Sequence, residues 1–395
     1  MKKHKGKILV LFLAVLLVSV SACKNPFLKK MLVEEEKGES SAVPKHTVTF
    51  SVEGGHGTLK AQVDGKEINS GDSVEQGKSV VFTAEPAPDY VVEQWTNGGT
   101  VIVEAGTDKT YTHTVTADAD IKVKFQSLFV EGGASLILSP NKLTIQVKAV
   151  TSDGSAVAVE GCTETSLASG TYTGLHAKGT VVILKGKITE LHCGHNQLTA
   201  LNVQGLTALQ VLDCGYNQLT ALDVQGLTAL QTLDCSDNLL TALNVQGLTT
   251  LQGLWCGSNQ ITALNAQGCT ALQTLDCWGN QLTELNVQGC TALQGLGCYS
   301  NQLTALNVQG CPALRGLDCC GNQLNDQAFT QIFSDLPTRT AGDGARCILY
   351  TEKPGVTEGN CTDFTTPAEL QAAFQNAKDV KHWKMHKLNT SGDEE

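Results

Sequence analysis

The 395-residue chain carries 39 acidic against 28 basic residues, a formal net charge of −11 at pH 7, and 41% of its residues are apolar. This apolar content is enough for ordinary hydrophobic cores, which excludes an intrinsically disordered chain, and a chain of this length usually holds two or three domains. The acidic balance argues against nucleic acids and anionic lipid surfaces as partners.

Residues 1–22 have the pattern of a secretory signal peptide. Four lysines precede the apolar run 8–20, and Ser21 and Ala22 follow it, a run too short for a comfortable membrane span. The residues from Val20 to Cys23 resemble a lipobox, which implies cleavage before Cys23 and acylation of that residue; plain cleavage beside an incidental cysteine is the alternative. Removal of residues 1–22 leaves 24 basic against 39 acidic residues, a charge near −15. We therefore predict attachment by a lipid anchor, followed by a flexible tether over residues 23–45.

Residues 46–126 show short alternating runs separated by turn dipeptides such as Asp64-Gly65 and Asn97-Gly98. This pattern predicts a small all-β domain. The order of strands and turns resembles the divergent internalin B-repeat module, which implies a stalk. We expect Tyr90 and Trp95 to be core residues, with a binding pair as the alternative. Residues 127–187, also rich in β patterns, are predicted to cap the first unit of the repeat that follows.

From 188 to 324 a 21-residue unit recurs, with an asparagine at the same place in each copy. The seven asparagines are Asn196, Asn217, Asn238, Asn259, Asn280, Asn301 and Asn322. A fixed period of this length predicts a solenoid, because one unit cannot bury its apolar face alone. We expect the asparagine amides to bond backbone groups of adjacent turns.

The unit matches the leucine-rich-repeat pattern L-x-x-L-x-L-x-x-N-x-L, with cysteine in the third apolar position. With its flanking modules, the chain resembles the BspA-like and internalin-like surface proteins of bacteria. The fold class predicted is mainly β with some α: a leucine-rich-repeat solenoid of seven rungs preceded by small all-β domains. Residues 325–390 resemble the C-terminal ending of such repeats and predict an α/β cap with helices near 326–336 and 367–380.

The fifteen cysteines fall into groups. Seven lie in the repeat strands, namely Cys193, Cys214, Cys235, Cys256, Cys277, Cys298 and Cys319, and three end the convex segment, namely Cys269, Cys290 and Cys311. We expect these ten to point inward as reduced core residues. Cys347 and Cys361 are a possible disulfide in an oxidising compartment. Cys320 is predicted on the concave face, either paired with a C-terminal cysteine or as a reactive thiol, and the partner of Cys162 is open.

The concave face is the predicted ligand-binding surface, because the copies differ there and hardly anywhere else. In each unit the third, fifth and seventh positions face outward. The fifth position holds His192, Asp213, Asp234, Trp255, Asp276, Gly297 and Asp318, and the seventh includes Trp278 and Tyr299. Relaxed drift at exposed positions is the alternative explanation.

We expect Trp255, Trp278 and Tyr299 to anchor a protein ligand, since tryptophan and tyrosine are enriched at interface hot spots. Tyr216 and His195 would extend the rim. Asp213, Asp234, Asp276 and Asp318 would select a basic partner, although an aspartate bonded only to neighbours or water is the plainer interpretation. His192 and Cys193 should face opposite ways, so no metal site is predicted, and neither a cofactor nor a catalytic motif is indicated.

The function predicted from these patterns is a lipid-anchored adhesin exposed at the outer membrane. Its partner would be a host matrix or epithelial protein, or another bacterium. A structural or spacer protein of the cell envelope, without a host ligand, is the alternative.

Overall fold

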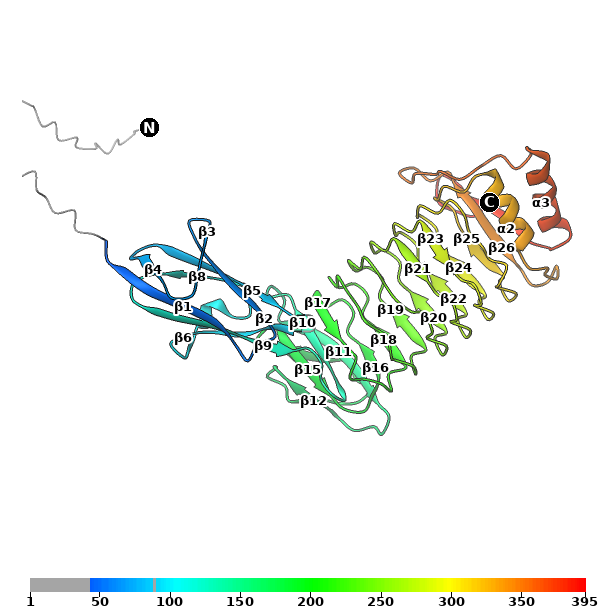
Figure 1. Ribbon diagram of the computed structural model, residues 1–395. Coiled ribbons are helices and arrows are strands. Elements are labelled where there is room, and N and C mark those ends of the chain that lie inside the picture. The colour runs from blue at the N-terminus through cyan, green and yellow to red at the C-terminus, as the bar shows by residue number, and fades with distance from the viewer. Residues whose placement is uncertain (1–42, 88–89) are drawn as a thin grey trace, which may run out of the picture.

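The computed structural model describes residues 43–87 and 90–395. The predicted signal peptide, the predicted lipidation site Cys23 and residues 24–42 of the predicted tether lie outside the described residues. The described chain is mostly β and elongated, with residues 45–127 at one end and two helices at the other (Figure 1). Within the described part of the chain, no helix is long and apolar enough to cross a membrane.

Residues 45–127 form two small sheets around one core. The first sheet has the order β4-β1-β9-β6-β7 and the second the order β3-β2-β5-β8. The strands are β1 (Lys45–Glu53), β2 (Gly57–Val63), β3 (Lys66–Ile68), β4 (Asp72–Glu75), β5 (Ser79–Pro86), β6 (Tyr90–Asn97), β7 (Thr100–Val101), β8 (Thr110–Thr114) and β9 (Ala119–Ser127), and a 3-10 turn, η1, covers Val103–Ala105. Trp95 is fully buried and its Nε1 donates to the Asp108 carbonyl at 2.9 Å, which confirms it as a core residue. Tyr90 is only partly buried and stacks on His56 with ring centroids 4.2 Å apart.

Residues 133–185 form strands that pair with both strands of the first repeat. These strands are β10 (Gly133–Leu138), β11 (Thr144–Thr151), β12 (Val157–Glu160), β13 (Ser166–Leu167), β14 (Thr173–His176) and β15 (Val181–Lys185). Strand β11 pairs antiparallel with β16 (Ile188–His192), and β10 pairs antiparallel with β17 (Leu198–Asn202). The first rung is therefore covered along both of its strands, as a cap requires. The boundaries of the predicted domains stay predictions.

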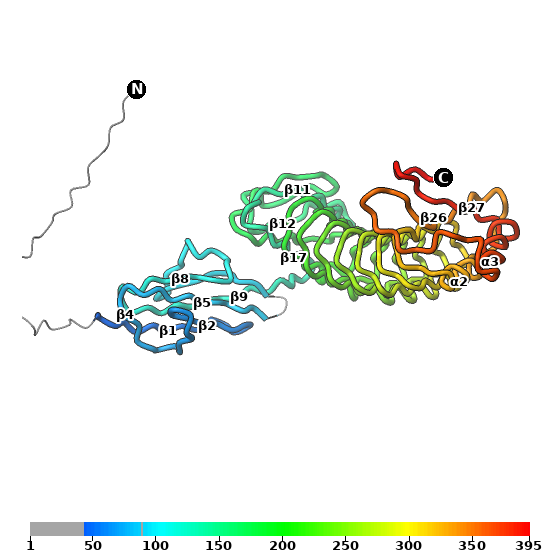
Figure 2. Tube along the Cα trace, turned by 90° about the horizontal axis from the view of Figure 1, so that it is seen from above, coloured from blue at the N-terminus to red at the C-terminus, as the bar shows by residue number. Residues whose placement is uncertain are grey.

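The repeats build the middle of an 11-stranded main sheet. After β16 come β18 (Val211–Asp213), β19 (Thr232–Asp234), β20 (Gly253–Trp255), β22 (Thr274–Asp276), β24 (Gly295–Gly297) and β25 (Gly316–Asp318), and all of these pair in parallel at a step of one unit. On another side of the solenoid, β21 (Ala263–Asn265) and β23 (Glu284–Asn286) form a two-stranded sheet. Viewed from above, the rungs follow one another as stacked coils (Figure 2).

The asparagines hold neighbouring rungs together. Asn259 is buried; its Nδ2 donates to the carbonyls of Cys235 (3.0 Å) and Cys256 (3.2 Å), and its Oδ1 accepts from the Leu240 N–H (2.9 Å). Similar contacts recur in the other copies. The predicted role of the asparagines, satisfying backbone groups that the bend leaves open, is confirmed.

The seven strand cysteines form a ladder inside the solenoid. Each is fully buried and free, as predicted. Burial raises the pKa of six of these thiols, and that of Cys319 is raised first by its hydrogen bond with Cys347 and then by burial. The second group is buried too: Cys269 donates its thiol to the Val245 carbonyl at 3.2 Å and Cys290 to that of Ala266 at 3.2 Å. These thiols fill core space and satisfy carbonyls of the preceding rung.

The C-terminal part closes the far end of the core. Helix α2 (Asp326–Asp335) is capped by Asn325, whose side chain accepts from the Ala328 N–H, and it buries Phe329 and Phe333. Strand β26 (Arg346–Thr351), helix α3 (Ala368–Asp379) and strand β27 (Lys384–Leu388) follow, and the two strands extend the main sheet in parallel. The two predicted helices are confirmed.

Candidate protein-binding surface

The outer face of the main sheet carries the residues predicted to bind a ligand. We call it the open face, and we number its rows by position in the repeat unit, so that row five runs from His192 to Asp318 and row seven includes Trp278 and Tyr299. Along β19, the Leu233 side chain is buried and Asp234 is half-buried, and the same alternation recurs in the other strands. The predicted division between core-facing and outward-facing rows is therefore confirmed.

The indole rings of Trp255 and Trp278 cover glycines of the open face. A Cβ atom on Gly253, two residues before Trp255, would clash with the Trp255 ring. A Cβ atom on Gly257, one rung before Trp278, would clash with the Trp278 indole. Both tryptophans are half-buried. Glycine therefore leaves room for each ring at its present position, and each tryptophan stays partly exposed.

Trp278 and Tyr299 form one aromatic unit. Their rings are stacked, with centroids 5.6 Å apart and planes 5° from parallel. Tyr299 is half-buried, and burial raises the pKa of its phenol to about 12, with a further contribution from the charges of Asp276 and Asp318. The predicted contact between Trp278 and Tyr299 is present, while their role as ligand anchors stays a prediction. Among the described rings, Trp255 stacks on neither of them.

The four row-five aspartates differ in their surroundings. Three accept a hydrogen bond from the backbone N–H two residues further on: Asp213 from Gly215 (3.4 Å), Asp234 from Ser236 (3.0 Å) and Asp318 from Cys320 (3.3 Å). Asp276 Oδ1 is buried and makes no such bond within 3.5 Å, although the Trp278 N–H lies close enough to favour the ionised carboxylate. Burial raises the pKa of Asp276, and it raises that of Asp318 to about 6. The local bonds fit the plainer interpretation at Asp213, Asp234 and Asp318. Asp276 and Asp318 are half-buried, and neither carboxylate is paired with a cationic side chain of the described residues.

A second group of predicted residues lies at the opposite end of the open face. His192 Nδ1 lies 3.4 Å from Asp213 Oδ2, and its Nε2 lies 3.6 Å from a carboxylate oxygen of Glu190. His195 stacks on Tyr216 with centroids 4.2 Å apart, and Tyr216 is 56% exposed. The predicted residues therefore fall into two groups, one around His192 and Tyr216 and one around the Trp278–Tyr299 stack.

Two of the cysteine predictions are corrected. The Cys347–Cys361 disulfide is absent, because both thiols are free. Cys347 is buried in the core beside Cys319, while the Cys361 thiol donates to the Asp363 carbonyl at 3.1 Å. Cys320 is free and buried rather than displayed, and burial together with the charge of Asp318 raises the pKa of its thiol. A raised thiol pKa means little thiolate at neutral pH, so Cys320 is not the reactive group considered.

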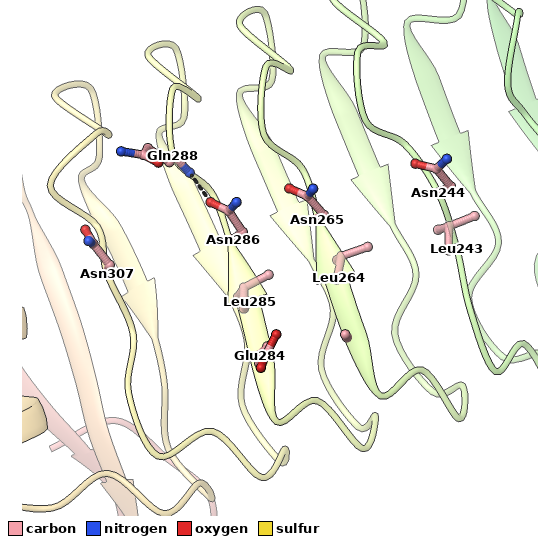
Figure 3. A pocket seen from close by; sticks show the side chains of 10 residues that line it. Leu243, Asn244, Leu264, Asn265, Glu284, Leu285, Asn286, Gln288 and Asn307 are labelled. Carbon is pink, nitrogen blue, oxygen red and sulfur yellow. Dashed lines mark hydrogen bonds between the residues drawn. The ribbon is translucent and has the colours of Figure 1, made fainter.

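A groove of about 470 Å³ lies over the small sheet of β21 and β23. Figure 3 shows that its asparagines line up from rung to rung. Their side-chain oxygens are used locally; for example, Asn286 Oδ1 accepts from the Gln288 N–H at 3.0 Å (Figure 3). The lining repeats with the unit, so this groove is a continuous structural ladder and offers no distinctive set of groups. Within residues 43–87 and 90–395, no three side chains are grouped as metal ligands.

Sequence reasoning missed the glycines of the open face. Gly253 and Gly257 make room for the indoles, and Gly295, Gly297 and Gly316 lie next to one another near Asp318. The sequence does contain a signal for these glycines, because row three holds the larger residues Thr232 and Thr274 in other units but glycine at 253, 295 and 316.

The comparisons with known proteins agree with this architecture. Residues 207–249 match the model for leucine-rich repeats (two copies), and residues 46–128 match the model for the divergent InlB B-repeat domain. Leucine-rich repeats and a divergent InlB B-repeat domain are therefore both recognised in the chain, each over the residues that its model matches. Such a solenoid presents an extended surface suited to contacts with other proteins.

Three of the solved structures similar to this chain come from two bacteria. The functional domain of InlJ from Listeria monocytogenes, which includes a cysteine ladder, is 34% identical and aligns over 42% of this chain and 40% of its own, with a TM-score of 0.37. A leucine-rich-repeat protein of Leptospira interrogans is 20% identical (46% and 50%, TM-score 0.33), and an internalin, inlF, of Listeria monocytogenes is 18% identical (50% and 66%, TM-score 0.31). The alignments thus span between 40% and 66% of those chains. No curated protein matches.

Proposed function

We propose that this chain is a cell-surface lipoprotein adhesin, anchored through Cys23, that binds a protein of host matrix or epithelial cells, or of another bacterium, through the open face. The observation that carries the proposal is the seating of Trp255 and Trp278 on glycines. Rigid aromatic side chains give large contact area at a low entropic cost, and they are the residues most enriched at binding hot spots.

The chemistry of the rungs supports the same conclusion. Outside the open face the units are nearly identical, whereas the open face concentrates two indoles, two phenols and several carboxylates. Half-exposed aromatic rings on a sheet reduce solubility unless a partner covers them. The carboxylates of Asp276 and Asp318 favour a partner with basic groups.

The test uses a soluble fragment of residues 45–395, which contains every strand and helix described. Its attachment to epithelial cells and to immobilised matrix proteins is compared with that of a Trp255→Ala, Trp278→Ala, Tyr299→Ala variant of equal melting temperature. Leu239→Ala is the matched control, because Leu239 is an exposed apolar residue outside rows five and seven.

We expect the triple variant to lose attachment and the control to keep it. A Gly257→Ala variant should weaken attachment as well, because its methyl group displaces the Trp278 indole without removing any aromatic residue. Equal attachment of all variants would move the adhesive site to the B-repeat domain or another face. Failure of the unmodified fragment to attach to any surface would reject the adhesin proposal in favour of a structural role in the envelope.

A further inference from the structure

A cleft of about 380 Å³ opens on the main sheet beside the Trp278–Tyr299 stack. Its floor is backbone, because Gly295, Gly297 and Gly316 lie side by side on β24 and β25. None of the three has a positive φ, and a Cβ atom on Gly295 would meet nothing within 4 Å. The backbone conformation therefore does not demand glycine here. The effect of the three glycines is to leave a bare depression in the sheet.

Carboxylates flank this depression. Asp276, Gly297 and Asp318 are in register on three adjacent strands, so the two acids stand on either side of a glycine. Asp276 leans over the floor, with Oδ1 3.0 Å from the place of a Cβ on Gly297, and that oxygen is buried without a hydrogen-bond partner. Tyr299 borders the cleft at the same glycine, 3.9 Å from that Cβ position.

The opposite wall is neutral in net charge. Arg346 lines it, but its guanidinium is paired with Glu394 at 2.7 Å, and the apolar side chains of Ile348 and Leu388 complete the wall. The charge left facing the cleft is therefore that of Asp276 and Asp318. Two half-buried carboxylates around an accessible depression are complementary to a cation that can also contact apolar and aromatic surface.

We propose that this cleft binds an arginine side chain of the protein partner. A guanidinium is planar, donates up to five hydrogen bonds, and can bond a carboxylate while it packs against an aromatic ring. Its flat shape suits a floor without side chains. Lysine, a compact and strongly hydrated charge, fits such a cleft less well. The proposal rests on the proposed function in one respect only, that the ligand is a protein.

Proton binding should compete with the guanidinium. Burial raises the pKa of Asp318 to about 6 and also raises that of Asp276. The titratable and charged groups that face them are Cys320, Tyr299, Glu394 with its partner Arg346, and Asp234. A bound cation favours the ionised carboxylates, so affinity should fall as the pH is lowered from 7.5 to 5.

The test measures binding of three capped tripeptides, Gly-X-Gly with X as arginine, citrulline or glutamate, to the fragment 45–395. The readout is the NMR shift of the backbone amides of Gly295, Gly297 and Gly316. We expect saturable shifts with the arginine peptide at pH 7.5 and an affinity for the neutral citrulline peptide lower by about tenfold, as for loss of a charge-assisted hydrogen bond. Binding of the arginine peptide should weaken at pH 5 and in the Asp276→Asn, Asp318→Asn variant.

The matched pair of variants is Gly295→Leu and Thr232→Leu. Both place a leucine in row three, but Gly295 lies in the cleft and Thr232 lies three rungs away. Because a side chain at Gly295 meets open space, Gly295→Leu should fold and abolish binding of the arginine peptide, while Thr232→Leu should retain it.

Absence of saturable shifts, equal binding of arginine and citrulline, or preference for glutamate would overturn the proposal, the last by assigning the cleft to an anion held by Arg346. The peptides are measured without cells, so failure of the cleft and failure of cell attachment are distinguishable.

Discussion

Replacing Asp318 by asparagine should stabilise the protein at neutral pH. Burial raises the pKa of this carboxyl from 3.8 to about 6. Between these two values the folded protein holds a proton that the unfolded chain has released, so stability falls as the pH rises through this interval. At pH 7.5 the ionised, buried carboxylate costs up to about 3 kcal/mol, from roughly two pKa units at about 1.4 kcal/mol each. Asparagine removes the charge and keeps an oxygen to accept the Cys320 N–H.

The assay is urea unfolding of the fragment 45–395, followed by circular dichroism. We expect Asp318→Asn to raise the free energy of unfolding at pH 7.5 by up to about 3 kcal/mol and to leave it nearly unchanged at pH 4. Asp213→Asn is the control, because its side chain is 38% exposed in the same row and its effect should stay below about 1 kcal/mol. Equal or lower stability of Asp318→Asn at pH 7.5 would refute the reasoning. A guanidinium bound beside Asp318 would offset this destabilisation by the ionised carboxylate.

Two further predictions concern the ladders of the solenoid. Asn259→Ala should lower the free energy of unfolding by about 3 kcal/mol, because the Leu240 N–H loses its acceptor and three carbonyls lose a donor. Urea unfolding checks this, and Asn265→Ala, at the exposed end of β21, should cost less than half as much. The ladder thiols should not react with Ellman's reagent at pH 8 until the protein is unfolded, because they are fully buried with raised pKa values. Release of chromophore from the ladder thiols of the folded protein would contradict their placement.

The positions of the core and of the open face could be predicted from sequence because two periods act together. The 21-residue period aligns the rungs, and the alternation within each strand decides which side chains point inward. Leu233 and Cys235 are buried and Asp234 is half-buried for this reason.

The direction in which the surface side chains lean could not be predicted in the same way. Trp278 lies over Gly257, and the Asp276 carboxylate lies over Gly297, so each side chain settles on a rung other than its own. These contacts depend on the absence of a Cβ atom in the neighbouring unit. A single unit does not contain that information, and it emerges only when adjacent units are compared row by row.

The C-terminal end shows a different reason for error. The polar sequence of residues 391–395 is typical of a solvated tail, but Lys387 and Glu395 exchange two backbone hydrogen bonds of 2.9 Å, and Glu394 reaches Arg346. The chain returns on itself near Gly392, whose φ is +87°. A polar, charged sequence is compatible with solvent, yet here it also supplies the partner of a main-sheet arginine. The predicted Cys347–Cys361 disulfide was wrong because the fold of the C-terminal segment was not foreseen. Strand β26 continues the main sheet, so the Cys347 side chain points into the core.

Deleting whole rungs separates the two ends of the open face. Removal of residues 217–237 joins Tyr216 to Asn238, and removal of residues 280–300 joins Gly279 to Asn301. Each deletion takes out one 21-residue unit and restores the repeat register, so each should fold and lose a similar amount of stability. The first removes Asp234 and leaves the stack and the cleft intact.

The second deletion removes Tyr299 and two of the cleft glycines, Gly295 and Gly297. We therefore expect the first deletion to retain both cell attachment and binding of the arginine peptide, and the second to lose both. Melting temperatures of the two variants provide the control for folding. Equal loss in both deletions would show that binding depends on the length of the open face, and retention in both would place the site outside it. Because the two variants differ in surface chemistry far more than in core composition, a difference between them belongs to the residues around the Trp278–Tyr299 stack.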